Sequence, residues 1–141
     1  MADDISDFAR SMGIATSGLR AQAGRMRVIS ENIANADSTG STPGADPYRR
    51  KIPTFVSQLD RALDARTVAL GKIARDSSSF RTKYEPSNPA ADQNGYVKYP
   101  NVNPLIEMTD MREAQRSYEA NLNIIGATRR MIQRTLDILK S

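Results

Sequence analysis

The residue types that carry most enzyme chemistry are missing from this chain of 141 residues, which has no cysteine and no histidine. Without them there is no cysteine nucleophile, no disulfide, no Cys/His zinc site and no serine–histidine–aspartate triad. The chain also lacks the glycine-rich patterns G-x-G-x-x-G and G-x-x-x-x-G-K-[ST], which bind phosphates. We therefore expect no enzymatic activity, no cofactor and no metal site.

Three charged clusters are the remaining candidates for chemistry. They are Asp3, Asp4 and Asp7 at the start, Arg49, Arg50 and Lys51 in the middle, and Arg129, Arg130 and Arg134 near the end. The acidic cluster could supply catalytic acids, but carboxylates at a helix start are favoured because they cap free N–H groups and oppose the helix dipole. The middle run could bind a phosphate or an acidic partner, although an exposed strand end is favoured. The last group could hold nucleic acid, although a helix C-terminus or ion pairs between subunits are favoured.

Composition limits the class of protein further. The net charge is only +4, from 20 basic and 16 acidic residues, which favours a solvated face of mixed sign over a nucleic-acid surface. A hydrophobic share of 39% with no tryptophan suits long helices that need partners. The sequence shows neither a cleavable signal nor an apolar run that could span a membrane. By these tests alone, the protein would be cytosolic.

Two long helices are the main elements that the sequence predicts, and they must position any functional residues. The first helix is predicted over residues 4–35. An apolar heptad repeat runs along it, with most positions of a second line three residues later also apolar. The predicted assembly seam comprises Met12, Leu19, Met26, Ile29 and Ile33. Gly13, Gly18 and Gly24 interrupt this helix, each at a cost of about 1 kcal/mol relative to alanine. Either the helix bends there, or close neighbours pack against the bare backbone.

A second helix is predicted over residues 104–140, with Asn103 as its N-cap and Pro104 as its first residue. It repeats the heptad pattern. Its predicted assembly seam comprises Met108, Met111, Tyr118, Leu122, Ile125, Ile132, Leu136 and Leu139. Further apolar residues lie off both seams, among them Ile14, Leu105 and Ile138. Because a two-helix hairpin buries only one side of each helix, helices from other subunits are expected to complete the packing.

The middle of the chain is predicted to hold loops and short strands. Strand character occurs in residues 48–56, with Pro53 as an irregularity, and in residues 67–73 and 96–99, and Asn94-Gly95 is a tight-turn signal. Phe55, Leu59 and Leu63 could instead lie on a short helix, and the pattern leaves both interpretations open. The predicted fold is therefore mainly α, with N- and C-terminal heptad helices paired as a coiled-coil hairpin and a small β-rich middle. The predicted segments are residues 1–36, 37–103 and 104–141.

Two stretches carry a resemblance to a known family. Ser30-Glu-Asn-Ile-Ala-Asn-Ala-Asp37 resembles the motif that closes the first helix of flagellar axial proteins, the rod and hook subunits. Two later segments are similar to the proximal-rod subunits of the basal body. The first runs from Tyr84-Glu-Pro-Ser-Asn-Pro to Tyr-Pro-Asn-Val-Asn103, and the second is Ala114-Gln-Arg-Ser-Tyr-Glu-Ala-Asn121. The motif residues are Asn32, Ala34, Asn35, Ala36, Tyr84, Pro86, Pro89, Asp92, Gly95, Tyr96, Val97, Pro100, Asn101, Glu107, Met108, Tyr118, Ala120 and Asn121.

The resemblance implies a structural subunit that assembles with copies of itself and with other proximal-rod proteins into a shaft, which transmits torque from motor to hook. It implies export of the unfolded chain by the flagellar type III apparatus, without a cleaved signal, and contact with the adaptor between rod and export gate. The expected location is then the basal body in the periplasmic space, in place of the cytosol. No nucleic acid and no lipid-embedded segment are expected.

Two other function classes stay open at this stage. A cytosolic coiled-coil adaptor would share both helices but gives no reason for residues 84–103. A basic nucleic-acid-binding protein would show a steep loss of affinity with salt. An enzyme is the least expected class, because no constellation of acid, base and nucleophile occurs.

Overall fold

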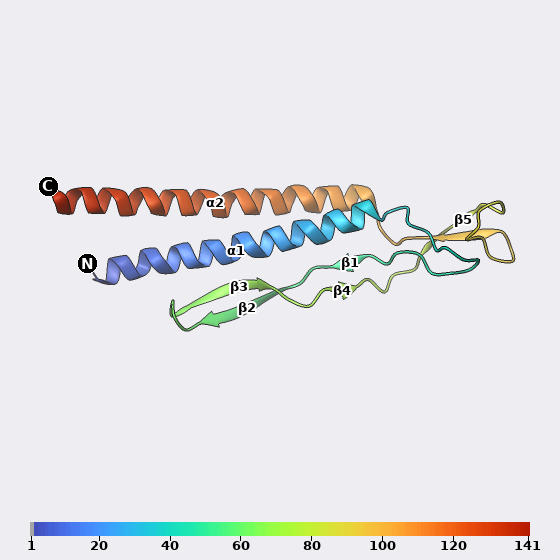
Figure 1. Ribbon diagram of the computed structural model, residues 1–141, viewed down its shortest axis with the longest axis horizontal. Helices are drawn as coiled ribbons and strands as arrows, with labels where there is room; N and C mark the ends of the chain where they lie inside the picture. The colour runs from blue at the N-terminus through green and yellow to red at the C-terminus, as the bar shows by residue number, and fades with distance from the viewer. Residues whose placement is uncertain (1) are drawn as a thin grey trace. The chain divides into compact units, whose positions relative to one another are not determined.

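The structure is a computed structural model that describes residues 2–141, with side chains described from residue 5 onward. A long helix lies at each end of the chain, and the residues between the two helices form short antiparallel strand pairs (Figure 1). The elements are α1 (Ala2–Ala34), β1 (Lys51–Ile52), β2 (Phe55–Asp60), β3 (Ala65–Leu70), β4 (Ala74–Arg75), β5 (Arg81–Tyr84), β6 (Tyr96–Tyr99) and α2 (Pro104–Lys140). The prediction of a mainly helical chain with a small β-rich middle is confirmed.

The described residues form two compact units. The first, here called the helical unit, contains α1 up to Met26, residues 54–71 with β2 and β3, and α2 from Glu113 onward. The second, the middle unit, contains residues 27–53 and 72–112. Each unit draws on all three predicted segments, because each helix contributes to both. The division of the chain into domains at 36 and 104 stays a prediction.

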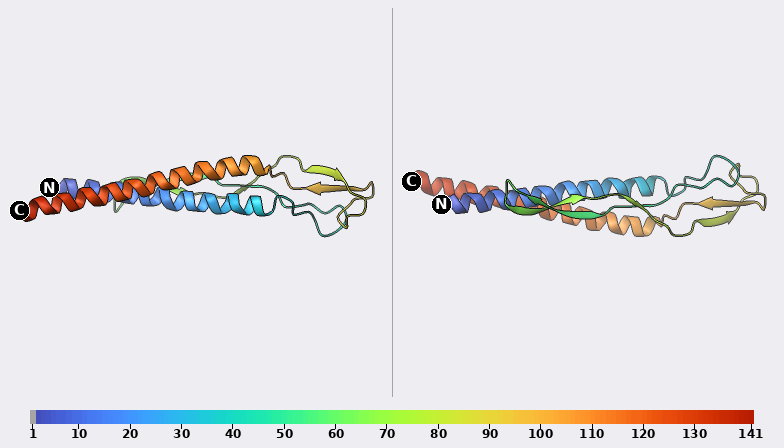
Figure 2. Two further views of the ribbon diagram at one scale, coloured as in Figure 1. Left: turned by 90° about the horizontal axis from the view of Figure 1, so that it is seen from above. Right: turned by 90° about the horizontal axis from the view of Figure 1, so that it is seen from below.

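In the helical unit, α1 lies between α2 and the β2–β3 hairpin (Figures 1 and 2). Its interior glycines make this possible. A Cβ atom at Gly18 would lie 2.9 Å from the side-chain amide of Asn121 on α2. Cβ atoms at Gly13 and Gly24 would lie 2.3 and 2.9 Å from the side chains of Leu63 and Leu70 in the hairpin region. The helix therefore keeps its glycines because neighbours approach on two sides, one of the two explanations that the sequence allowed.

The β2–β3 hairpin pairs Phe55 with Leu70 at one end and Asp60 with Ala65 at the other. Residue Asp64 closes its turn with a left-handed φ of 47°, which Asp tolerates better than most residues. Side-chain and backbone bonds hold the hairpin to α1: the Ser17 hydroxyl accepts a hydrogen bond of 3.2 Å from the Val68 N–H, and Arg10 Nε donates to the Leu63 carbonyl at 3.0 Å.

The middle unit is organised around two further strand pairs. β1 pairs with β4, and β5 pairs with β6. The loop over residues 85–95 joins β5 to β6 and ends in a turn at Gly95, whose φ of 82° favours glycine. The predicted turn at residues 94–95 and the strand at 96–99 are confirmed. The strand predicted over residues 48–56 is wrong as a single element, because only Lys51–Ile52 and Phe55 onward pair with other strands. The small core of this unit comprises Val28, Ile29, Ala36, Ala90, Val97, Pro100 and Val102.

The start of α2 is capped as predicted. The Asn103 side-chain oxygen accepts the Leu105 N–H at 3.1 Å, and Pro104 is the first helical residue. Near the start of α1, the Asp7 carboxylate pairs with Arg10 at 3.2 Å. The side chains of Asp3 and Asp4, assigned a capping role from the sequence, lie outside the described residues.

Glycine-to-alanine changes should have opposite effects at two helix positions. Gly126→Ala should raise the free energy of unfolding by about 0.5–1 kcal/mol, because the new methyl meets only the flexible end of Arg130 at 3.5 Å. Gly18→Ala should lose this gain or destabilise, because its methyl displaces the Asn121 amide. Urea unfolding of the two variants followed by circular dichroism checks this; equal stabilisation by both would contradict the close approach at Gly18.

Candidate assembly surfaces and a buried polar cluster

A carboxylate is fully buried where α2 begins. Glu107 has 0% of its surface exposed, and the Arg50 guanidinium donates from Nε to its Oε1 atom. The same guanidinium lies 3.5 Å from an Asp76 carboxylate oxygen and 3.7 Å from one of Asp110. A buried carboxylate is costly unless it is paired and hydrogen-bonded, so Arg50 is the partner that allows Glu107 to be there.

The Asn32 side chain completes this buried polar cluster. It is 0% exposed, and its Nδ2 atom donates to the Lys51 carbonyl at 2.8 Å and to Glu107 Oε2 at 3.2 Å. Its Oδ1 atom accepts the Tyr48 hydroxyl at 2.8 Å and the Lys51 N–H at 2.9 Å. All four hydrogen-bonding positions of the amide are therefore used. One side chain near the end of α1 thus holds the segment that contains β1.

Two further asparagines of the family motifs also use their side-chain amides to bond to the backbone. The Asn101 side-chain oxygen accepts the Arg50 N–H at 2.8 Å, and its Nδ2 atom donates to the carbonyls of Asp76 and Ser78 at 3.2 Å. The Asn35 side chain donates to the Glu31 carbonyl at 2.9 Å, and the same carbonyl also accepts the Asn35 backbone N–H at 3.1 Å. The sequence marked these residues by resemblance only. The structure shows what their amides contact.

Electrostatics in this cluster shift the pKa values of Arg50, Asp76 and Tyr48. Burial tends to lower the pKa of Arg50, but the hydrogen bonds and charges of Glu107 and Asp76 together outweigh it, so the pKa is raised. Backbone and side-chain hydrogen bonds from Ser78 lower the pKa of Asp76, and Arg50 adds to this. For Tyr48, burial raises the pKa to about 12, helped by the negative charges of Glu31 and Glu107.

The second motif stretch forms the β5–β6 hairpin and its loop. The Asp92 carboxylate accepts the N–H groups of Asn94 and Tyr96 at 2.8 and 2.9 Å. Tyr84 and Tyr96 meet edge to face, with ring centroids 5.3 Å apart, and both rings remain exposed. Val97 and Pro100 are buried, whereas Pro86 and Pro89 are exposed in the loop. These motif residues therefore shape a loop and leave two aromatic rings on the surface.

The predicted seam residues divide by exposure. Ile29 is buried. Half-buried are Met12, Leu19, Met26 and Ile33 of α1 and Met111, Tyr118, Ile125 and Ile132 of α2. Exposed are Met108, Leu122, Leu136 and Leu139, at 44–54%. Of the remaining motif residues, Ala36 is buried, Asn121 is half-buried, and Ala34 and Ala120 are exposed.

Another line of α2 is more enclosed than the predicted second half of its seam. Glu107, Ala114 and Thr128 are 0–4% exposed, and Asn121 contacts Gly18. These residues are seven apart, one position before Met108, Gln115, Leu122 and Arg129. The heptad pattern did not select this line as a seam because its residues are polar or small, although Glu107 and Asn121 were marked by the family resemblance. The repeat of small and polar residues itself was the available signal.

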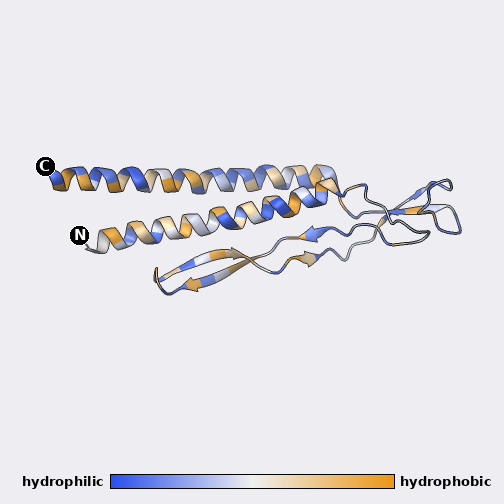
Figure 3. Ribbon diagram, viewed as in Figure 1, coloured by the Kyte–Doolittle hydropathy of each residue, from blue (hydrophilic) through white to orange (hydrophobic). Residues whose placement is uncertain are grey.

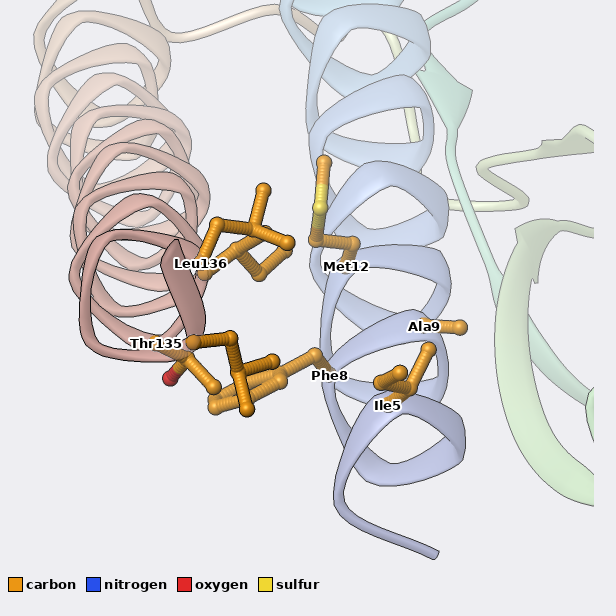
Figure 4. Close-up of a pocket in the computed structure, with 8 residues that line it drawn as sticks. Ile5, Phe8, Ala9, Met12, Thr135 and Leu136 are labelled. Atoms are coloured by element: carbon orange, nitrogen blue, oxygen red, sulfur yellow. The ribbon is translucent and has the colours of Figure 1, made fainter. Parts of the chain in front are cut away.

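Apolar side chains remain on the surface of the helical unit. Figure 3 shows apolar bands along both helices. Exposed members in this unit include Ile14, Leu122, Ile124, Met131 and Ile138. A groove of about 240 Å³ lies between the start of α1 and the end of α2, lined almost entirely by apolar atoms (Figure 4). Its lining residues are Ile5, Phe8, Ala9, Met12, Ile132, Thr135, Leu136 and Leu139.

Comparison with known proteins places these features in a family. A family model described as "Flagella basal body rod protein" matches residues 12–42, and one described as "Flagellar basal body rod FlgEFG protein C-terminal" matches residues 93–138. The flagellar basal-body rod protein FlgC of Agrobacterium fabrum is 58% identical over 91% of this chain and 92% of its own length. The chain belongs to the FlgC family of flagellar basal-body rod proteins.

More distant FlgC proteins also match this chain over most of its length. Those of Bacillus subtilis and Salmonella typhimurium are 38% and 40% identical, over 92% and 89% of this chain and 97% and 92% of their own lengths. The chain is thus a structural rod subunit of the flagellar basal body, which assembles with other rod components. The two matched ranges of this FlgC-family chain contain Asn32 and Glu107, so they meet in the buried polar cluster. None of its described helices has an apolar stretch able to cross a membrane.

Removing the buried charge should destabilise the FlgC-family chain strongly. Glu107→Gln should lower the free energy of unfolding by about 3 kcal/mol, at the lower end for a broken buried ion pair because Arg50 keeps Asp76 and Asp110 nearby. Glu119→Gln, at an exposed position on the same helix, is the control and should change little. Chemical denaturation followed by circular dichroism measures both. Equal stability of the two variants would mean that the cluster contributes nothing.

Stability should also fall at high pH through Tyr48. Its pKa is about 12 in the folded chain and about 10 when unfolded, so the unfolded state releases the proton more easily. The stability contributed by the neutral phenol is complete below about pH 10 and is lost as the pH rises to about 12. Unfolding free energies measured across this range should fall less steeply for Tyr48→Phe than for the unchanged chain. Identical slopes would contradict the assignment.

Proposed function

We propose that this FlgC-family chain is a subunit of the proximal rod, and that its two helices build the wall of the shaft that transmits torque from motor to hook. The proposal is supported by the apolar side chains left on the surface of the helical unit. Leu122, Ile124 and Met131 are 47–51% exposed on α2, and the groove between the helix ends opens to the surface. Helices of neighbouring subunits, including copies of this chain, would cover these residues.

Apolar contact along helices suits a torque-bearing wall. Each apolar side chain removed from water stabilises an interface by about 25 cal/mol per Å². Side chains on long helices also interlock with those of neighbours, which resists sliding and twisting. The predicted coiled-coil seam of Met12, Leu19, Tyr118 and Ile125 would supply the inner contacts. The exposed residues would supply those between subunits. The segment from 37 to 103 would then form an outer layer that contacts neighbours.

Export fits the same picture. Long helices with few large buried side chains fold weakly alone and gain stability on assembly. We infer that the chain leaves the cell unfolded through the flagellar type III apparatus, in agreement with the absence of cysteine, and that it meets the rod-to-export-gate adaptor and the other proximal-rod proteins in the periplasmic space.

Leu122→Asp tests the proposal. In a strain deleted for this gene, a plasmid with the unchanged gene should restore rods, hooks and motility, whereas the Leu122→Asp gene should not, because a carboxylate would be buried at the interface. Electron microscopy of basal bodies and swimming assays give the result. Asn123→Asp adds the same charge at the next exposed position and is the matched control.

Leu122 is 51% exposed, so the purified variant should keep the circular dichroism and unfolding free energy of the unchanged chain. A deletion strain with normal flagella would overturn the rod assignment. Full rescue by Leu122→Asp would overturn the assembly role of this face of α2.

A further inference from the structure

The basic run at residues 49–51 divides between two environments. Arg50 turns inward to Glu107, as described above. Side chains alternate along an extended strand, so Arg49 and Lys51 lie on the opposite side from Arg50. Both line a hollow of about 270 Å³ in the middle unit, together with Arg75 and Phe80. The sequence left open whether this run serves an acidic partner or is a strand end, and the hollow bears on that choice.

Two cations face each other across the β1–β4 pair. Lys51 is the register partner of Arg75, so their side chains project on the same side of the pair. Like charges directly opposite each other destabilise a strand pair. Lys51 is compensated by its ion pair with Glu31. The guanidinium of Arg75 is exposed and makes no hydrogen bond or ion pair with any described residue.

A third cation is held rigidly beside them. The Arg49 guanidinium stacks 4.1 Å above the centre of the Phe80 ring. Its Nη1 atom donates to the carbonyls of Asp76 and Ser78, at 2.9 and 3.2 Å. These two bonds leave its Nε and Nη2 donors without a partner among the described residues. A stacked, planar guanidinium with free donors is already arranged for an anion, which reduces the entropy lost on binding.

The acidic residue of the hollow does not neutralise these arginines. Asp46 also lines it, but its carboxylate pairs with Lys98 at 2.9 Å. With Lys51 and Asp46 both engaged, the charges of Arg49 and Arg75 remain uncompensated. Two uncompensated guanidinium groups line this one hollow, and charge-assisted hydrogen bonds from guanidinium to carboxylate are among the strongest available to a protein.

We propose that this hollow, the arginine pocket lined by Arg49, Lys51, Arg75 and Phe80, binds an acidic side chain of a neighbouring rod subunit. The inference rests on the proposed function, because assembly in the rod supplies the neighbour. A carboxylate is favoured over a free anion because the chain works in contact with other protein chains. An ion pair between the pocket and a neighbouring carboxylate would help to fix the orientation of the two subunits and to select the correct partner. The apolar contacts of the helices are less directional.

Charge reversal at Arg75 tests the pocket in cells. In the deletion strain, Arg75→Glu should reduce the fraction of cells with complete rods and hooks about tenfold or more, whereas Arg75→Lys should retain most assembly. Arg61→Glu, the same reversal at an exposed arginine outside the pocket, should assemble normally. Rescue by the unchanged gene is scored in the same experiment. It tests the proposed rod function by itself, so that a failure of that function can be told apart from a failure of the pocket proposal. If the unchanged gene and Arg75→Glu both rescue fully, or if Arg61→Glu is as harmful, the pocket proposal is overturned.

Two further measurements separate a docking defect from other causes. Purified Arg75→Glu should be at least as stable as the unchanged chain, because the Arg75 side chain is exposed and a carboxylate opposite Lys51 removes a like-charge pair. If it is less stable, Arg75→Gln replaces it in the cell assay and must still reduce assembly. Inorganic phosphate titrated at constant ionic strength, followed by NMR of the arginine side chains, tests a free anion. If phosphate binds and Arg75→Glu still assembles normally, the proposal that the pocket binds a carboxylate of a neighbouring subunit is overturned.

Discussion

The contact between Asn32, Glu107 and Arg50 is the interaction on which the rest of the middle unit depends. A carboxylate with no exposed surface must be paired, and the pairing draws together the end of α1, the start of α2 and the segment before β1. Asn32 uses every donor and acceptor of its amide to do so. The geometry of such bonds is directional, so the cluster sets the register of residues 48–51 in a way that a small apolar core could not.

The helical unit follows a different principle. There the closest contacts are made by glycines and short side chains, which allow backbones and amides to approach. Few large side chains are buried, and many large apolar ones remain at the surface. Close contacts at the glycines of α1 therefore define the fold of this unit, whereas much apolar area is left for contacts with other chains. This division suits a structural protein of the flagellar rod, whose final packing is completed only in the assembly.

Sequence reasoning succeeded where a local rule applied. Asn103 and Pro104 begin α2, and Gly95 closes the β5–β6 turn, because capping and left-handed φ depend on neighbouring residues alone. It failed to place the enclosed line of α2, since a heptad template selects large apolar residues and that line contains Glu107, Ala114 and Thr128. It also read residues 48–56 as one strand, although the backbone there bonds to the amides of Asn32 and Asn101.

The sequence by itself determined the two helices, their length, the absence of cysteine and histidine chemistry, and the family motifs. These depend on residue type, periodicity and local capping, which are properties of a short stretch of chain. Only the tertiary structure decided that Arg50 turns inward while Arg49 and Lys51 face a hollow with Arg75. It alone also decided which neighbours occupy the space at Gly13, Gly18 and Gly24. Contacts between residues far apart in the chain depend on which elements pack together, and no local pattern encodes that.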